Sequence, residues 1–442
     1  MTRTLRAVCT ALLAAFAPLC LHAQDTTFRG ITISGTYDPL HDKVNVVVLP
    51  VVGAFGDSIR AIIQRDLDFS DQVTLIPVDS TDPNSLRGAG AGGGLNYALF
   101  QRISAAAVVE ITPVATGLHI ALHDVAHSSV VNVGEFPLPS TGLNRDWRMG
   151  VHRASDEIVR WITGQRGIAA TRIAYIRGPS IRVIDSDGAD EITVPTDENG
   201  SSPAWNRAGN MLVYTTFGVS ASGGASHIVA FDLATARPHL VVPPGRNGQF
   251  VGPIFSVDGS SVIYSREGEN GSEMFSVPVS GGAPRQLSTS PRSTINVQPT
   301  ISPDGRRIVF VSNRLGPPEL YIMDADGTNV EMLTAYDFNE KNWRSDPDWS
   351  PDGRRIAFQE MVGGRFQIRT IFAAGGTPKQ LTSDGENEQP SWAPDGRHLV
   401  FTSSRTGVRQ LWVLDTESNR VRQLTKGAGS RIAAWSPRLA GQ

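Results

Sequence analysis

Apolar runs and polar turns alternate with a regular period through the last two-thirds of the chain. The clearest unit runs from Trp349 through the turn Ser350-Pro351-Asp352-Gly353 to the apolar run Ile356-Ala357-Phe358. An aromatic or aliphatic residue precedes the turn in six such units, at intervals of 43 to 50 residues. These residues are Trp205, Phe255, Ile301, Trp349, Trp392 and Trp435. A repeat length in the forties is typical of one propeller blade.

Each unit predicts four short antiparallel strands. In the turn, Pro presets φ, Asp bonds its own backbone and Gly supplies a positive φ. The run 356–358 is a second strand, the run 411–414 is typical of a third, and a fourth ends near motifs such as 423–425. One blade cannot cover its own apolar faces, whereas blades arranged in a ring bury one another's faces.

The two ends of the repeat region are incomplete in complementary ways. The segment 171–176 matches a second strand with no first strand before it, and the segment 434–437 is a first strand with no second strand after it. We therefore predict that both ends share one blade, which removes two open sheet edges. The predicted fold class is mainly β: a six-bladed β-propeller over residues 168–442, with an open β array as the alternative.

Residues 24–167 lack this period and predict a small α/β domain. Apolar runs indicate strands at 43–49, 73–76 and 106–111, and the stretch 118–136 alternates as a hairpin around Ser128-Ser129. Helical spacing of apolar residues indicates helices at 59–67 and 95–103. A last helix, carrying Ser155, Glu157 and an apolar stripe at 158–162, is expected to end at Gly164.

Residues 1–23 have the features of a secretory signal peptide. Arg3 and Arg6 precede an apolar run that ends at a small residue, Ala23. Both cysteines, Cys9 and Cys20, lie in this leader, so the mature chain would hold no disulfide and no thiolate metal site. No second stretch approaches the roughly 18 apolar residues of a membrane span. We expect an exported, soluble protein that does not span a membrane, with lipidation at Cys20 as the alternative.

Three patterns suggest a chemical site, and each has a simpler structural explanation. His119, His123 and His127 share a strand face, but four residues along a strand span about 13 Å, which is too far for one metal ion. We expect an exposed polar strand face there. The glycine-rich segment 88–94 lacks the Gly-Lys-Ser/Thr ending of a phosphate loop. The segments 185–188 and 324–327 begin like calcium loops without the later ligands, so we expect blade turns there.

Catalysis and nucleic-acid binding find little support in the sequence. There is neither a Gly-x-Ser-x-Gly elbow nor a His-Glu-x-x-His motif. His398 and Asp346 are the best candidates for catalytic groups, and they lie at different heights in their repeats. Loss of the two leader arginines takes the formal net charge from −3 to −5, which argues against a nucleic-acid partner. We expect a monomer that is not an enzyme and needs no cofactor or metal.

The phrase x-Pro-x-Trp-Ser-Pro-Asp-Gly-x-x-Ile-Ala-Phe, repeated after a leader and a small α/β domain, resembles the TolB family of the periplasmic Tol-Pal system. The likeness covers nearly the whole mature chain, including the helix at 152–157, the entry strand at 171–175 and the ending at 434–437. The resemblance implies a periplasmic adaptor without catalytic activity. It implies two partners, the peptidoglycan-associated lipoprotein Pal and the inner-membrane protein TolA, and a role in outer-membrane integrity and envelope constriction during cell division.

The resemblance also implies where the partners bind. The family's Pal-facing residues lie just before the recurring Pro of each blade, in loops that gather around the channel mouth. The matching positions and their neighbours here are Ser202, Gln249, Gly252, Val297, Gln298, Asp346, Glu388 and Gln389. The implied TolA-binding arm is the segment from residue 24 to about residue 35, with Phe28, Ile31 and Ile33. A polar ring at the mouth would suit a partner's protruding surface.

Three departures from the family pattern affect the expected partner contacts. The segment Asn206-Arg207-Ala208-Gly209 replaces Ser-Pro-Asp-Gly, Ala433 stands where Pro is usual, and Gln249 stands where the family often has His. Two other functions stay open. A propeller hydrolase or lyase predicts convergent His or carboxylate groups with shifted pKa values in the channel, and a glycan-binding envelope protein predicts an aromatic-lined mouth.

Overall fold

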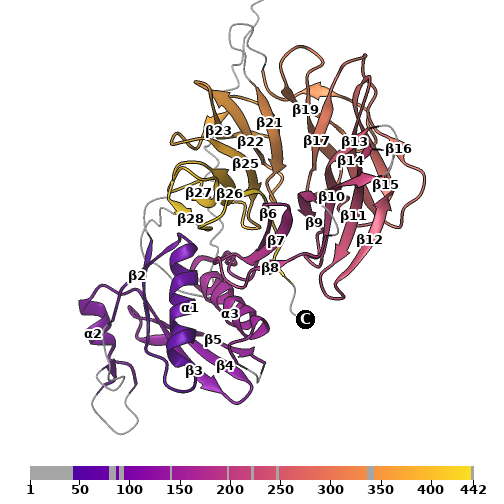
Figure 1. Ribbon diagram of the computed structural model, residues 1–442. Coiled ribbons are helices and arrows are strands. Elements are labelled where there is room, and N and C mark those ends of the chain that lie inside the picture. The colour runs from indigo at the N-terminus through magenta and orange to yellow at the C-terminus, as the bar shows by residue number, and fades with distance from the viewer. Residues whose placement is uncertain are drawn as a thin grey trace, which may run out of the picture.

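The structure is a computed structural model in which an α/β domain packs against a ring of six four-stranded sheets (Figure 1). It describes residues 43–78, 86–88, 94–139, 142–196, 199–220, 223–244, 248–335 and 343–439. The expected signal peptide and the arm residues Phe28, Ile31 and Ile33 lie outside the described residues. No helix among the described residues has the length and apolar character needed to cross a membrane.

The α/β domain is built on a five-stranded sheet of order β2-β1-β3-β4-β5. The strands are β1 (Val44–Val48), β2 (Val73–Leu75), β3 (Ala107–Val114), β4 (Gly117–Asp124) and β5 (Ser129–Pro137). Strand β1 runs parallel to β2 and β3, and β3, β4 and β5 are antiparallel. The apolar runs therefore form the predicted strands, including the hairpin.

Helices cover both faces of this sheet. Helices α1 (Gly56–Phe69) and α3 (Arg145–Thr163) pack on the face that holds Val46 and Val48, and α2 (Tyr97–Arg102) packs on the face that holds Val47. This division follows from the alternation of side chains along a strand. Helix α3 ends at Gly164, as predicted, with a left-handed φ of 79°.

The start of α3 differs from the sequence-based expectation. The helix begins at Arg145, ten residues before Ser155, and Asn144 caps it by accepting a hydrogen bond of 2.8 Å from the backbone N–H of Trp147. Ser155 instead lies mid-helix, where its hydroxyl donates to the carbonyl of Val151 at 3.1 Å. The apolar stripe continues back through Ala154, Val151 and Trp147 at helical spacing, so the sequence did carry a signal for the first turns of the helix.

The ring contains six blades of four antiparallel strands each. Blade 1 consists of β9 (Asn199–Trp205), β10 (Met211–Ser220), β11 (Gly223–Asp232) and β12 (Arg237–Val242). Blade 2 consists of β13 (Gln249–Phe255), β14 (Ser261–Gly268), β15 (Gly271–Pro278) and β16 (Arg285–Gln286). Blade 3 consists of β17 (Asn296–Ile301), β18 (Arg307–Ser312), β19 (Glu319–Asp324) and β20 (Glu331–Met332). Blades 4 and 5 consist of β21 (Arg344–Trp349), β22 (Arg355–Val362), β23 (Arg365–Phe372) and β24 (Lys379–Gln380); and β25 (Asn387–Trp392), β26 (His398–Ser403), β27 (Gln410–Asp415) and β28 (Val421–Gln423).

Blade 6 joins the two ends of the repeat region, as predicted. Strand β29 (Ser430–Trp435) is its innermost strand and pairs with β6 (Arg172–Arg177), which is followed by β7 (Ser180–Asp185) and β8 (Ile192–Thr193). The backbone N–H of Ser436 donates to Arg172 at 2.8 Å, and Ser436 accepts a bond of 2.9 Å in return. The pairing with β29 therefore covers the inner edge of β6 and closes the ring.

Each blade buries one aromatic side chain of its second strand almost completely. These residues are Tyr175, Tyr214, Tyr264, Phe310, Phe358 and Phe401. The Pro-Asp-Gly turns form as the sequence predicts: in blade 3 the Ser302 hydroxyl donates to Asp304 at 2.6 Å and Gly305 has a φ of 73°. The repeated phrase thus encodes both the turn and the aromatic core of each blade.

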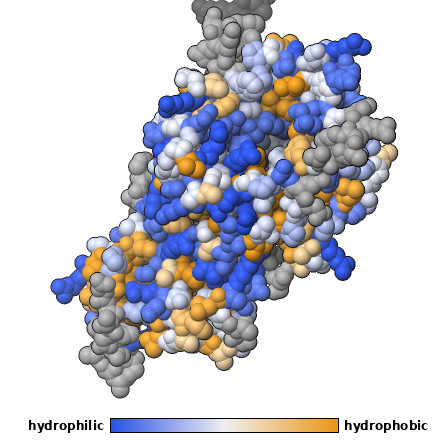
Figure 2. All heavy atoms as spheres, viewed as in Figure 1, coloured by the Kyte–Doolittle hydropathy of each residue, from blue (hydrophilic) through white to orange (hydrophobic). Residues whose placement is uncertain are grey.

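The α/β domain contacts blades 5 and 6 through charged groups. The end of α1 and the following turn supply Asp68 and Asp71, which pair with Arg420 of blade 5 at 2.9 and 3.0 Å. From α3, Arg148 pairs with Asp187 of blade 6 at 2.6 Å. On the face shown in Figure 2, hydrophilic residues cover most of the propeller, and hydrophobic residues gather over the α/β domain.

Candidate functional site at the channel mouth

The residues predicted to face a partner share an unusual backbone. One residue in each innermost strand, directly before the recurring Pro or its Ala433 replacement, has a left-handed φ between 49° and 58°. These residues are Ser202, Gly252, Gln298, Asp346, Gln389 and Ile432. The register of each innermost strand with its neighbour shifts at the same place, so each strand carries a bulge there. The residues therefore lie inside the innermost strands and not in loops before them.

Hydrogen bonds link two neighbouring pairs of these positions across blade boundaries. The amide group of Gln298 donates to the Asp346 carboxylate at 2.8 Å and accepts from the Asp346 backbone N–H at 3.0 Å. The side-chain oxygen of Gln389 accepts from the backbone N–H of Ile432 at 3.1 Å. A Cβ on Gly252 would lie 3.4 Å from the Cα of Gln298. We call these six positions the mouth ring.

The three neighbouring positions that were predicted as contacts are placed differently. Glu388 accepts a bond of 2.9 Å from Arg409 beside the mouth ring. Gln249 is exposed at the start of β13, where it pairs with Glu267 across the strand. Val297 turns into the sheet packing, against the apolar cluster between blades 3 and 4. The structure therefore brings Glu388 to the ring and turns Val297 away from it.

The mouth ring carries a carboxylate with an altered acidity. Burial raises the pKa of Asp346 to about 6, and the negative charge of Glu388 adds to this rise. The hydrogen bond from Gln298 works in the opposite direction. Close to neutral pH, Asp346 therefore carries a negative charge that its surroundings stabilise poorly, and a cationic or hydrogen-bonding partner would stabilise it.

Three exposed apolar side chains lie at the same end of the propeller. Leu315, Trp343 and Val408 are 67%, 51% and 52% exposed. Leu315 and Val408 lie in connections from second to third strands, and Trp343 lies directly before an innermost strand. In antiparallel blades these connections share one end, and the bond of 3.0 Å from the Arg344 backbone to Pro318 joins two of them. The repeat pattern gave no signal for these residues, because they fall in segments that vary between blades.

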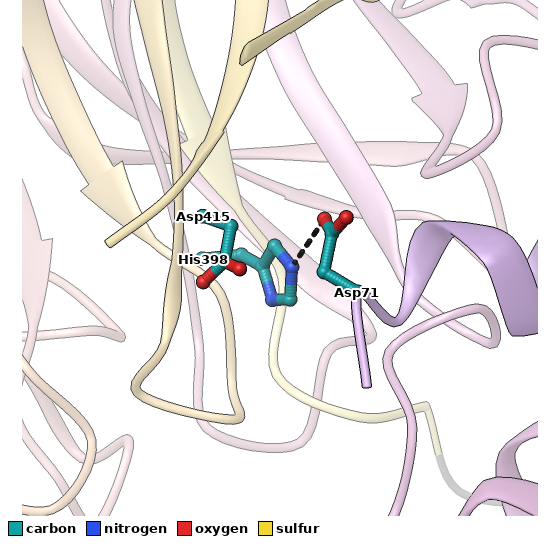
Figure 3. Close-up of side chains that lie close together, drawn as sticks. All are labelled: Asp71, His398 and Asp415. Carbon is teal, nitrogen blue, oxygen red and sulfur yellow. Dashed lines mark hydrogen bonds and ion pairs between the residues drawn. The ribbon is translucent and has the colours of Figure 1, made fainter. Parts of the chain in front are cut away.

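His398 and Asp346, the best candidates for catalytic groups, do not lie together in the structure. His398 is fully buried between blade 5 and the α/β domain, where its Nε2 contacts Asp71 at 3.2 Å (Figure 3). Its Nδ1 contacts Asp395 at 2.6 Å. Asp346 belongs to the mouth ring at the other end of its blade. The convergent His and carboxylate pair that a channel enzyme requires is therefore not formed by these two residues.

Asp71, His398 and Asp415 come close enough to suggest a metal site, since one ligand atom of each lies within 4.8 Å of the others. However, arginines already hold both carboxylates: Arg420 contacts Asp71 at 3.0 Å, and Arg397 contacts Asp415 at 2.6 Å. Burial disfavours charge on His398, but the ion pair with Asp395 outweighs it and raises the pKa of His398 to about 9. A protonated imidazole has no lone pair for a metal, so this group is an ion network between domains.

The three histidines of the α/β domain each contact a different acidic residue. His119 contacts Glu135 at 2.5 Å, and His127 contacts Asp124 at 2.8 Å. The expectation of an exposed polar strand face is wrong for His123, which is buried and contacts Tyr97 at 2.8 Å and Glu110 at 3.2 Å. A strand face can be buried in part when a helix such as α2 lies beside it.

The turns that begin like calcium loops use their carboxylates internally. In blade 3, the carboxylate of Asp326 accepts from the backbone N–H of Thr328 at 2.9 Å, and Asp324 accepts from Asn329 at 2.7 Å. In blade 6, Asp187 pairs with Arg65 and Arg148 at 2.7 and 2.6 Å. These contacts are those of blade turns and of the domain interface, and not those of a calcium loop.

Comparison with known proteins agrees with this architecture. Residues 159–439 match the family described as TolB beta propeller domain. The chain belongs to the TolB family. Two curated relatives, both called Tol-Pal system protein TolB, come from Bordetella pertussis and Bordetella parapertussis. Each is 30% identical over 194 residues, and the match covers 42% of this chain and 42% of the relative's length.

The TolB-family likeness extends to the α/β domain at the level of fold. The crystal structure of TolB from Acinetobacter baumannii superposes with a TM-score of 0.75 and 22% sequence identity. The match covers 90% of this chain and 97% of that chain. Both parts of this TolB-family chain therefore share their arrangement with a TolB of known structure.

Proposed function

We propose that this TolB-family protein is a non-catalytic periplasmic adaptor of the Tol-Pal system that binds a Pal-like lipoprotein at the mouth ring. The main support for this proposal is the left-handed backbone of the mouth-ring residues. Left-handed backbone costs a non-glycine residue free energy, on the order of 1 kcal/mol or more, and such strain is concentrated at functional sites. Here five of the six positions are not glycine, and one is the β-branched Ile432.

The surroundings of the mouth ring suit a protein partner. Polar groups of several blades converge on the ring, and Leu315, Trp343 and Val408 offer exposed apolar area at the same end. A polar centre with nearby aromatic and aliphatic side chains is a common composition for a protein interface. The raised pKa of Asp346 adds a carboxylate that gains stability when a partner's donor or cation covers it.

The second half of the proposal concerns the N-terminal arm. Residues 1–23 would be removed as a signal peptide, residues 24–167 would form the α/β unit, and residues 168–442 would form the propeller. The arm with Phe28, Ile31 and Ile33 would bind a TolA-like inner-membrane protein by adding a strand to it. The adaptor, a monomer, would then link the lipoprotein to the inner membrane and support outer-membrane integrity and constriction at division.

Calorimetric titration with the soluble domain of the Pal-like lipoprotein from the same cell tests the first half. Gln298→Ala and Asp346→Arg should each weaken a saturable 1:1 binding by tenfold or more, because they break the bonds between blades 3 and 4. Arg354→Ala is the matched control, since Arg354 is exposed at the opposite end of blade 4. Absence of binding by well-folded protein, or equal binding by all variants, would overturn the assignment.

Neither alternative function gains a specific observation at this site. A channel enzyme would need His398 and Asp346 to converge, and they lie at different ends of the fold. A glycan site would need aromatic side chains in the mouth ring, whose members are polar, aliphatic or glycine. Aromatic residues do line the channel, but at its other end.

A further inference from the structure

The channel holds a cavity at the end opposite the mouth ring. Its volume is about 360 Å³, which is near the lower limit of ligand pockets. Every blade contributes to its wall through the last residues of its innermost strand and the turn that follows. The rings in the wall are Trp205, Phe255, Trp349, Trp392 and Trp435. This cavity therefore offers a much more aromatic surface than the mouth ring does.

The outer rim of the cavity is apolar in five blades. The residue two positions after the aromatic or aliphatic position is Val257, Pro303, Pro351, Pro394 or Pro437. In blade 1 this position is Arg207, in the segment that departs from Ser-Pro-Asp-Gly. Its guanidinium reaches past blade 2 and donates to the carbonyl of Pro303 in blade 3 at 2.9 Å. Among the described residues of the cavity wall, Arg207 is therefore the one cation, and the matching position of the other five blades is apolar.

The polar groups deeper in the wall are already used to hold the blades together. Thr300 accepts from the backbone N–H of Trp349 at 3.2 Å, Asp348 from that of Trp392 at 2.7 Å, and Ser391 from that of Trp435 at 3.1 Å. A sugar, which needs many hydrogen-bond partners, would find few here. Among the residues of this wall, Arg207 and Asp348 are the charged ones, and Asp348 lies deeper, along the strand.

We propose that this cavity binds an apolar carboxylate, with its apolar part among the aromatic rings and its carboxylate on Arg207. Burial of an apolar group gives the binding free energy, and the planar guanidinium fits a carboxylate with two parallel hydrogen bonds. The volume suits one or two side chains. The last residue of a peptide chain, when that residue is apolar, and a medium-chain fatty acid share this chemistry.

The cavity is independent of the proposed partner site. Along each innermost strand, its wall begins two residues after the mouth-ring position, for example Ala204 after Ser202. Ligand binding here is therefore expected to survive Gln298→Ala, and lipoprotein binding is expected to survive Arg207→Gln. Failure of one proposal leaves the other intact.

The test titrates the mature protein with N-acetyl-Leu-Phe, with its C-terminal amide, and with octanoate. Binding is read by calorimetry and by tryptophan fluorescence, because Trp205, Trp349, Trp392 and Trp435 line the cavity. We expect the free acid to bind about tenfold more tightly than the amide, as one hydrogen bond to a charged group gives. Arg207→Gln should abolish this preference, and Arg207→Lys should keep part of it.

Arg354→Gln is the matched control, since it removes an exposed arginine from a turn at the same end but outside the cavity wall. Binding of the dipeptide acid alone would identify a chain end as the ligand, and binding of octanoate alone would identify a fatty acid. No heat and no fluorescence change with any carboxylate up to about 5 mM would overturn the proposal. A tenfold acid preference that persists in Arg207→Gln would also overturn it.

Discussion

Replacing His398 by Gln should remove a charged link between the α/β domain and blade 5. In the native fold, the buried imidazole lies between Asp395 at 2.6 Å and Asp71 at 3.2 Å. The ion pairs also hold the pKa of Asp395 at about 2 and lower the pKa of Asp71. Gln keeps hydrogen-bonding groups near both carboxylates but brings no positive charge, so the variant isolates the contribution of the charge.

The magnitude follows from the acidity of the imidazole. Its pKa rises from 6.5 to about 9 on folding, because the ion pair with Asp395 outweighs the cost of burial. A rise of this size corresponds to roughly 3 kcal/mol of stability. Since the pKa of the folded state is the higher one, this stability is fully present below pH 6.5 and is lost as the pH rises through 9.

Urea unfolding at pH 6.0 and pH 9.5 measures the effect. Circular dichroism and tryptophan fluorescence should be followed together, so that separate unfolding of the two domains is detected. His398→Gln should destabilise the protein by roughly 3 kcal/mol more at pH 6.0 than at pH 9.5. His152, whose pKa is also raised to about 9, is present in both proteins and cancels in this difference.

His239→Gln serves as the control, because His239 is exposed on β12. The control should leave the unfolding free energy nearly unchanged at both pH values. If His398→Gln destabilised the protein equally at pH 6.0 and pH 9.5, the buried imidazole would be neutral and the ion network would need another explanation.

Three further predictions concern the mouth ring, the blade core and a blade turn. Asp346→Asn should raise the thermal unfolding midpoint at pH 7.5 and leave it unchanged at pH 4. The pKa of Asp346 is raised to about 6, so the wild-type protein loses stability when this half-buried carboxyl group ionises. Phe358→Ala should cost about 3–5 kcal/mol in urea unfolding, since this fully buried ring fills the core of blade 4, and a cost below about 1 kcal/mol would contradict that role. Gly327→Ala should lower the unfolding midpoint far more than Gly364→Ala. A Cβ on residue 327 would lie 2.0 Å from the Leu287 carbonyl oxygen, whereas a Cβ on residue 364 would meet nothing within 4 Å. Equal losses would show that the positive φ alone sets the cost.

The blades could be predicted because their information is local and repeated. A turn of the Pro-Asp-Gly type, complete in three blades, and the aromatic residue nine positions after Trp349 or Trp392 recur along the chain. The missing strands at the two ends predicted the closure between β29 and β6. The first turns of α3 were missed although Trp147, Val151 and Ala154 continue its apolar stripe and Asn144 caps it.

The candidate site was predictable in position but not in geometry. The residues before each Pro were identified, yet a left-handed φ at Gln298 or Asp346 has no sequence signal, since neither residue is glycine. The ion network was hidden for a different reason. Asp71 and His398 are separated by 327 residues, and no local pattern connects an α/β turn with a strand of blade 5. Arg207 was visible as a departure, but only the structure places it over the cavity.

The pairing of β29 with β6 has a consequence for the order of synthesis. Arg172 meets Ser436, 264 residues later in the chain, so the ring cannot close until its last strand has left the ribosome. Until then β6 presents an unpaired edge, which is a template for aggregation. A chain cut short before Ser430 would keep that edge permanently. In a truncated product, the unpaired edge of β6 would therefore remain accessible to proteases and chaperones.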